Sequence, residues 1–153
     1  SDVYKRQVKG QKGVLSVEKK LFVETNNGTN RQIRPVTPEQ PLRIGDKVIV
    51  RLTIRTDREM NYVFLKDLRA GCFEPADQLS GPESRDGIWY YRSPKDVSEN
   101  FFINRLPEGT FVLEYPVYVS RSGEYAGGIS TIQCMYAPEF VSHTAGESLR
   151  IMP

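Results

Sequence analysis

The sequence has little of the side-chain chemistry that most enzymes need. Its 153 residues include one histidine, His143, and two cysteines, Cys72 and Cys134. A hydrolase triad needs a histidine beside a nucleophile and a carboxylate, and a structural zinc site needs four Cys or His ligands. No nucleophile-elbow pattern lies near His143, and no closely spaced cysteine pair occurs. We therefore predict a protein that is not an enzyme and that uses no metal or other cofactor.

An excess of charge of one sign is also absent, and so is a long apolar run. Lys and Arg number 21 against 19 Asp and Glu, which gives a net charge of +2 with both signs scattered along the chain. Nucleic-acid-binding proteins concentrate basic residues on one face, so we predict no nucleic-acid partner. Mean hydropathy is −0.47. No stretch reaches the about 18 apolar residues of a membrane span, so we expect no direct membrane insertion.

The first residues contain no apolar segment of the kind that forms the centre of a signal peptide. We interpret residues 1–12 as a tag, a linker or an upstream segment, and residues 13–153 as a single domain. A chain of this length is typical of one domain with its own hydrophobic core.

The main signal in the sequence is a period of two. Between Lys47 and Arg55 the even-numbered residues are all apolar, and most odd-numbered residues are charged or polar. This alternation predicts a strand with one face in a core and the other in water. Residues 111–119 alternate in the same way, and Pro116 predicts that this strand lies at a sheet edge or is bulged there.

Shorter apolar or aromatic runs, separated by Gly, Pro, Asn and Asp, fill the rest of the chain. These runs are residues 14–23, 32–36, 62–65, 88–91, 101–103, 129–135 and 149–152. No window sustains the apolar stripe of a helix. We predict an all-β fold, an antiparallel β-sandwich of seven to nine strands with fibronectin III-like or immunoglobulin-like architecture.

The two cysteines leave two alternatives open. Cys72 and Cys134 could form one disulfide, or each could be a buried free thiol. Residues 71–75 superficially resemble the Gly-Cys-x-Glu-Gln motif in which a cysteine thiol and a glutamine side chain form a thioester. The glutamine position is Pro75, which has no carboxamide, so no thioester can form there.

Three consecutive aromatic residues, Trp89, Tyr90 and Tyr91, could stack against sugar rings. This gives an alternative function, that of a carbohydrate-binding or adhesion module. Because alternate strand residues face inward, we instead favour a core position for Trp89 and at least one of the tyrosines.

Seven segments, in order along residues 43–152, resemble the last macroglobulin-like domain of bacterial α2-macroglobulin family proteins, which trap proteases. They are residues 45–54, 62–67, 73–75, 90–92, 100–103, 106–110 and, most specific, Thr131-Ile132-Gln133-Cys134-Met135-Tyr136-Ala137-Pro138-Glu139-Phe140. The resemblance implies a macroglobulin-like sandwich at the carboxyl end of a longer parent chain. It also implies that the parent lies in the periplasm, outside the cell or on the cell surface.

The resemblance further implies a partner and two site residues. The partner is the thioester domain of the same parent chain, and target proteases are contacted through the parent. Met135 and Tyr136 match a Met-Tyr pair that shields the thioester from water and amines, on a loop shaped by residues 137–140. A flexible thioether and a large flat ring suit an irregular surface. The alternative for Met135 and Tyr136 is ordinary core packing. If they shield a partner, we expect both to be exposed in this domain alone.

Overall fold

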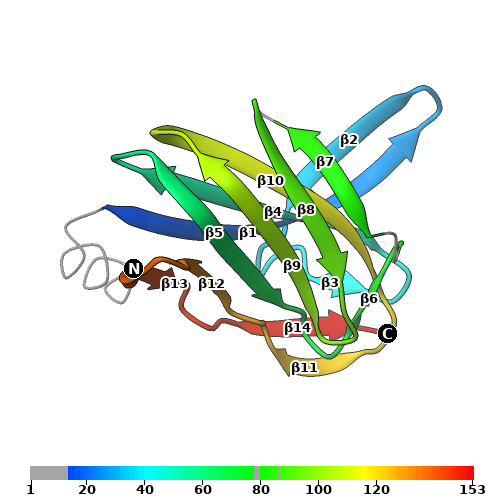
Figure 1. The fold of residues 1–153 in the computed structure, drawn as a ribbon. Coiled ribbons are helices and arrows are strands. Elements are labelled where there is room, and N and C mark those ends of the chain that lie inside the picture. Colours follow the sequence, from blue (N-terminus) through cyan, green and yellow to red (C-terminus); the bar gives the residue numbers. More distant parts are fainter. Residues whose placement is uncertain (1–13, 78–79, 86) are drawn as a thin grey trace.

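The structure, a computed structural model, describes residues 14–77, 80–85 and 87–153, and these residues form fourteen strands. Two sheets lie face to face as the layers of a sandwich, with a smaller third sheet across one end (Figure 1). The upstream segment expected over residues 1–12 lies outside the described residues.

One layer has five strands and the other has six. The five-stranded sheet has the order β2 (Asn30–Pro35), β1 (Leu15–Asn27), β4 (Lys47–Thr56), β10 (Gly109–Val119) and β6 (Phe73–Pro75). The six-stranded sheet has the order β13 (Ala137–His143), β12 (Ser130–Cys134), β5 (Met60–Leu68), β9 (Ser98–Leu106), β8 (Ile88–Pro94) and β7 (Gly81–Arg85). The third sheet has the order β11 (Gly123–Ala126), β14 (Ser148–Met152) and β3 (Leu42–Arg43).

These sheets confirm the predicted all-β antiparallel sandwich, with more strands than the seven to nine expected. The pairing of β14 with β3 is parallel, and the other named strand pairs are antiparallel. The additional strands include β3, β6 and β11, which have two, three and four residues. Runs this short show no alternation of apolar and polar residues, because tertiary contacts rather than local pattern define them.

The core lies between the two large sheets, where the predicted alternation places it. On β4, Val48, Val50, Leu52 and Ile54 are buried, and on β10, Leu113, Tyr115, Val117 and Val119 are buried. They pack against buried residues of the six-stranded sheet, which include Leu65, Phe101, Ile103 and Ile132. The inward faces of these strands were therefore predicted correctly, although Ile49 on the other face of β4 is also buried.

The position of Pro116 differs in part from the prediction. The pairing of β10 with β4 runs through Pro116 and Ile49 without a bulge, and β10 lies between β4 and β6. However, β6 pairs only with residues from Val117 onward. The Pro116 carbonyl accepts a hydrogen bond from Ala76 N at 3.4 Å, so its ring nitrogen faces the end of this short pairing. A missing N–H is tolerated there because few ladder hydrogen bonds depend on it.

Both cysteines are buried free thiols, so the disulfide alternative is not realised. Cys72 lies immediately before β6, and Cys134 ends β12 in the opposite layer. Burial raises the pKa of the Cys72 thiol. A thiol that stays protonated is a poor nucleophile, so Cys72 behaves as a small core residue.

A buried carboxylate connects the two layers. Asp67 of β5 is fully buried, and its Oδ1 accepts hydrogen bonds from Lys19 Nζ and Ser130 Oγ, each at 2.7 Å. Its Oδ2 accepts a hydrogen bond from the Tyr115 hydroxyl. Lys19 and Tyr115 belong to the five-stranded sheet, whereas Asp67 and Ser130 belong to the six-stranded sheet. One side chain therefore joins four strands of both layers.

The Lys19 ammonium also holds backbone at this place. Lys19 Nζ donates to the carbonyl oxygens of Leu68 at 3.2 Å and Gly128 at 3.0 Å. A Cβ atom added to Gly128 would lie 1.7 Å from the Leu68 carbonyl oxygen. Glycine is therefore required there, because any side chain would separate the segments whose carbonyls Lys19 binds.

A second buried ion cluster lies beside the first. Glu99 of β9 is fully buried, and Arg69 Nη1 lies 3.0 Å from its Oε2. Arg92 Nε pairs with the other Glu99 oxygen, and Arg92 Nη1 lies 3.1 Å from Asp77 Oδ1. The Arg92 guanidinium is 5.8 Å from the centre of the Tyr115 ring. Tyr115 thus contacts both clusters from the opposite layer.

We expect Asp67→Asn to destabilise the domain by about 3 kcal/mol, because it leaves Lys19 partly buried without its counter-charge. Urea unfolding followed by circular dichroism measures the change. Asp57→Asn is the matched control, since Asp57 pairs with Arg58 at the surface, where ion pairs contribute little. Equal stability of the two variants would contradict a structural role for the buried carboxylate.

Candidate functional site

Met135 and Tyr136 form the two-residue turn that joins β12 to β13. The strands close around the turn with Cys134 opposite Ala137, and the register shifts between Gln133 and Cys134, so that residues 138–140 of β13 have no partner on β12. Met135 is 53% exposed and Tyr136 is 78% exposed. The exposure expected for both residues is therefore observed, and neither packs in the domain's own core.

Neighbouring strands hold this turn in place. Met135 N donates to the Tyr62 carbonyl oxygen of β5 at 2.8 Å. The Cys134 thiol, which is buried, donates to the Asn61 carbonyl oxygen at 3.4 Å. Gln133 Nε2 donates across the hairpin to the Pro138 carbonyl oxygen at 3.4 Å. Because two hydrogen bonds tie the start of the turn to β5, the exposed pair projects from an anchored backbone.

Tyr62 is the residue on which the turn rests. Its φ is +59°, and among the described residues it is the one non-glycine residue with a positive φ. Its ring contacts that of Tyr136, with centroids 4.7 Å apart and planes inclined at 58°. A left-handed backbone is costly for an aromatic residue, so surrounding contacts must maintain it. The left-handed backbone directs the Tyr62 carbonyl toward Met135, while the Tyr62 ring lies against Tyr136.

The segment expected to shape a loop is a strand instead. Ala137, Pro138, Glu139 and Phe140 begin β13, but only Ala137 pairs with β12 there, and the pairing resumes at Val141. Pro138 fits an outer strand of the sheet, because β13 has a partner on one side only. Residues 137–140 are therefore strand in backbone conformation, but residues 138–140 lie outside the pairing with β12, next to the Met135–Tyr136 turn.

The expectation that Trp89 packs in the core is wrong. Trp89 is 70% exposed and Tyr91 is 47% exposed, whereas Tyr90 between them is buried. β8 alternates as predicted, but Ile88, Tyr90 and Arg92 take the inner face, where Arg92 pairs with Glu99. The register that brings Arg92 to its buried partner therefore turns Trp89 outward.

Aromatic side chains continue across the outer face of the six-stranded sheet. Tyr91 lies opposite Phe102 of β9, which in turn lies opposite Phe64 of β5. The Phe64 and Phe102 rings stack with centroids 4.8 Å apart and planes 24° apart. We call this set the aromatic row, and its six residues are Tyr136, Tyr62, Phe64, Phe102, Tyr91 and Trp89.

Other possible sites have less support. His143 is exposed at the end of β13, and no described carboxylate or hydroxyl hydrogen-bonds to its ring. Within residues 14–77, 80–85 and 87–153, no three His, Cys, Asp or Glu side chains are placed to hold a metal ion. The same residues contain no helix long and apolar enough to cross a bilayer. A groove of about 1170 Å³ runs along β1 and β14, and neither Met135 nor Tyr136 lines it.

The family model described as "Bacterial Alpha-2-macroglobulin MG10 domain" matches residues 15–139, which is most of the chain and includes the Met135–Tyr136 turn. This chain belongs to that family. The resemblance to the bacterial α2-macroglobulin family is thereby confirmed, and the chain is a macroglobulin-like domain of that family.

Solved structures of bacterial alpha-2-macroglobulins share the fold. Salmonella alpha-2-macroglobulin reacted with methylamine is similar with a TM-score of 0.69 and 22% identity, over 92% of this chain and 9% of that one. Escherichia coli alpha-2-macroglobulin activated by porcine elastase has a TM-score of 0.70 and 18% identity, over 92% of this chain and 13% of that one.

One curated relative was found by sequence. The chain is 28% identical over 109 residues to Circularly permutated Ras protein 2 of Dictyostelium discoideum, which covers 71% of this chain. The chain spans about 3% of that protein's length. Each relative is thus much longer than this macroglobulin domain.

Several residues of the aromatic row were not predicted from the sequence to be exposed. The run 62–65 was read as a strand, which places Tyr62 and Phe64 on one face, but nothing indicated that this face is the outer one. Phe102 was missed for the same reason, since Phe101 and Phe102 are indistinguishable as hydrophobic residues. The left-handed backbone of Tyr62 has no local signal, because Gly, Asn and Asp are the residues that usually adopt it.

The backbone of Tyr62 gives a test of the turn's geometry. We expect Tyr62→Gly to be more stable than Tyr62→Val by about 1 to 2 kcal/mol, because glycine accepts a positive φ and a β-branched residue does not. Urea unfolding of the two variants measures the difference. In an ordinary strand valine is the better residue, so the opposite order would contradict the left-handed conformation.

Proposed function

We propose that this domain is a non-catalytic part of a bacterial protease trap, located toward the carboxyl end of the parent chain. It docks on the thioester domain of that chain, and Met135 and Tyr136 cover the thioester. The observation that carries this proposal is the exposure of both side chains on an anchored two-residue turn. The family membership supplies the context.

The chemistry of the pair suits a cover. A thioester survives only if water and amines cannot reach its carbonyl carbon. Met135 has a flexible thioether that fills irregular gaps, and Tyr136 adds a broad ring with a polar tip. The turn is already fixed by Tyr62 and Asn61, so docking requires little further ordering of the backbone.

The solved relatives support a trigger. The Salmonella relative reacts with methylamine, a small amine, and the Escherichia coli relative is activated by elastase, a protease. By analogy, proteolysis of this domain's parent would displace the domain and uncover the thioester. Target proteases then contact the parent rather than the Met135–Tyr136 turn. The family resemblance leads us to expect that the parent acts in the periplasm, outside the cell or at the cell surface.

We expect Tyr136→Ala in the full-length parent to accelerate its reaction with methylamine at least about tenfold, because removing the ring exposes the thioester to amines. A tenfold change in rate corresponds to a free-energy barrier lower by about 1.4 kcal/mol. Met135→Ala should have the same direction of effect. Release of the thioester thiol, titrated over time with a chromogenic disulfide, measures the rate. The matched control is Tyr118→Ala, since Tyr118 is 43% exposed on the opposite layer. Rates equal to wild type in both turn variants would refute the shielding role.

A carbohydrate-binding module is the second candidate function, favoured by the exposed rings of Trp89 and Tyr91. The third ring of that expected platform, Tyr90, is buried. Trp89 is the single tryptophan of the chain, so its fluorescence reports binding directly. A saturable change on titration with soluble oligosaccharides would support this candidate, and an unchanged spectrum would remove it.

A further inference from the structure

The aromatic row forms an uncharged strip from the Met135–Tyr136 turn across the sheet. Three of its residues lie directly opposite one another on neighbouring strands: Phe64 pairs with Phe102, and Phe102 pairs with Tyr91. The residues that continue this line on either side, Gln133 of β12 and Pro82 of β7, are also uncharged. Neighbouring strands are about 4.8 Å apart, so the line from β12 to β7 is about 19 Å long.

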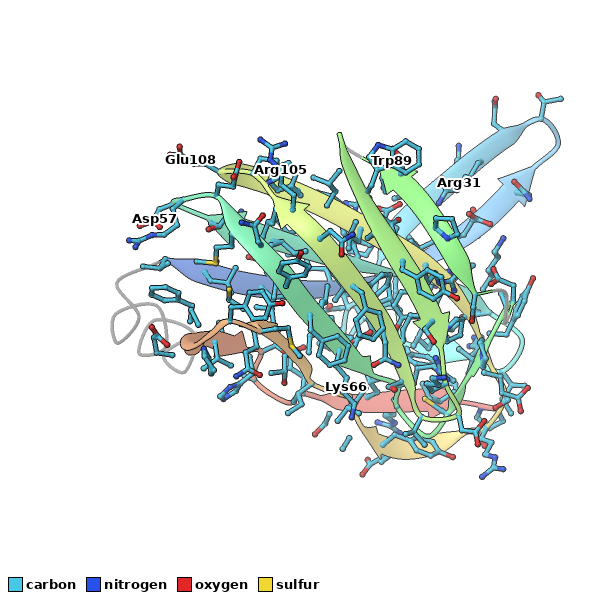
Figure 2. All side chains as sticks on the ribbon, in the orientation of Figure 1. Arg31, Asp57, Lys66, Trp89, Arg105 and Glu108 are labelled. Carbon is cyan, nitrogen blue, oxygen red and sulfur yellow. The ribbon has the colours of Figure 1, made fainter. Side chains whose placement is uncertain are left out.

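Charged side chains flank the row rather than interrupt it. Lys66 is exposed two residues beyond Phe64 on β5. Arg105, near the other end of β9, pairs with Glu59 at 2.8 Å. Figure 2 shows Trp89 and Arg105 toward one end of the sheet and Lys66 toward the other. An apolar centre with a charged rim is the usual composition of a protein–protein interface.

We propose that the aromatic row is the surface through which this domain docks on the thioester domain of its parent. The inference rests on the proposed function and names the surface that function needs. The proposal is supported by the continuity of the two surfaces. The ring of Tyr136, which belongs to the proposed cover, contacts the ring of Tyr62, and the aromatic row extends from Tyr62 across the sheet. A domain that contacts Met135 and Tyr136 is therefore placed to contact the adjacent aromatic row as well.

The length of the relatives agrees with a covering domain that belongs to the same parent chain. This domain corresponds to 9% of the Salmonella chain, so in such a parent most of the protein surface belongs to other domains. A face with several large exposed aromatic side chains is unfavourable in water and is stabilised by a covering surface. Within one chain, the covering domain is present at high effective concentration.

The same features argue against a sugar as the occupant. Bound sugars bring many hydroxyl groups, each of which needs a hydrogen-bond partner when it is desolvated. The six side chains of the row offer three Tyr hydroxyls and the Trp89 ring N–H, and Phe64 and Phe102 at its centre offer none. Tyr, Trp, Phe and Met are instead the residues enriched at the centre of protein interfaces.

Radical footprinting with mass spectrometry tests the surface in the full-length parent. Labelling of Trp89 and Tyr91 is compared between native parent and parent reacted with methylamine. We expect at least about fivefold slower labelling of both residues in the native form, because docking covers them. Tyr118 on the opposite layer is the internal control and should label equally in both forms. Equal labelling of Trp89 and Tyr91 in the two forms would overturn the proposal.

A double variant tests whether the row holds the docked state. We expect Tyr91→Ser with Phe102→Ser to accelerate the reaction of the parent with methylamine about tenfold or more, since interface aromatics commonly contribute more than 1 kcal/mol each. Tyr118→Ser is the matched control and should react as wild type. Both row residues are half exposed, so folding should persist, and circular dichroism of the variant checks this.

These experiments distinguish a failure of the docking proposal for the aromatic row from a failure of the shielding proposal for Met135 and Tyr136. If Trp89 and Tyr91 are protected but Tyr136→Ala leaves the methylamine rate unchanged, the row docks and the pair does not shield. If Tyr136→Ala accelerates the reaction but Trp89 and Tyr91 label equally, the pair shields and the row is not the docking surface. A methylamine rate unchanged in the folded double variant would also overturn the role of the row.

Discussion

The Asp67 carboxylate connects the two layers of the sandwich from within its interior. It is fully buried and accepts hydrogen bonds from Lys19, Ser130 and Tyr115, which lie on three different strands. Burial, followed by the charge of Asp67, holds the pKa of the Tyr115 hydroxyl well above its ordinary value, so this hydroxyl remains a donor at any physiological pH. Apolar contacts stabilise the layers without direction, whereas these hydrogen bonds fix their relative position.

That fixed position determines what the outer face presents. With Asp67 inward on β5, its strand neighbours alternate so that Phe64 and Lys66 face outward. On β8, the pairing of Arg92 with Glu99 has the same effect and turns Trp89 and Tyr91 outward. The buried ions and the exposed aromatics are therefore two consequences of one register, since shifting a strand by one residue would exchange its faces.

Sequence alternation was enough to predict the sandwich, and it assigned the faces of β4 correctly because that strand has one apolar face and one polar face. It failed on β8, where apolar and aromatic residues occupy both faces and a buried Arg–Glu pair decides between them. It could not place Tyr62, whose backbone is set by tertiary contacts. The exposure of Met135 and Tyr136 was anticipated only through the family resemblance, since a Met-Tyr pair at a strand end is ordinarily core.

The anchoring of the turn constrains how a cover built on it could be removed. Met135 and Tyr136 are held by contacts with Tyr62 and Asn61 and by the pairing of Cys134 with Val63 and Ala137, so the turn has little freedom to swing away by itself. Cys134 is a free thiol, so no covalent bond ties the hairpin to another element. If the turn covers a partner, its release therefore requires the domain to move as a body. An uncharged aromatic surface suits such a movement, because apolar contact is non-directional and can be separated without leaving buried charges unpaired.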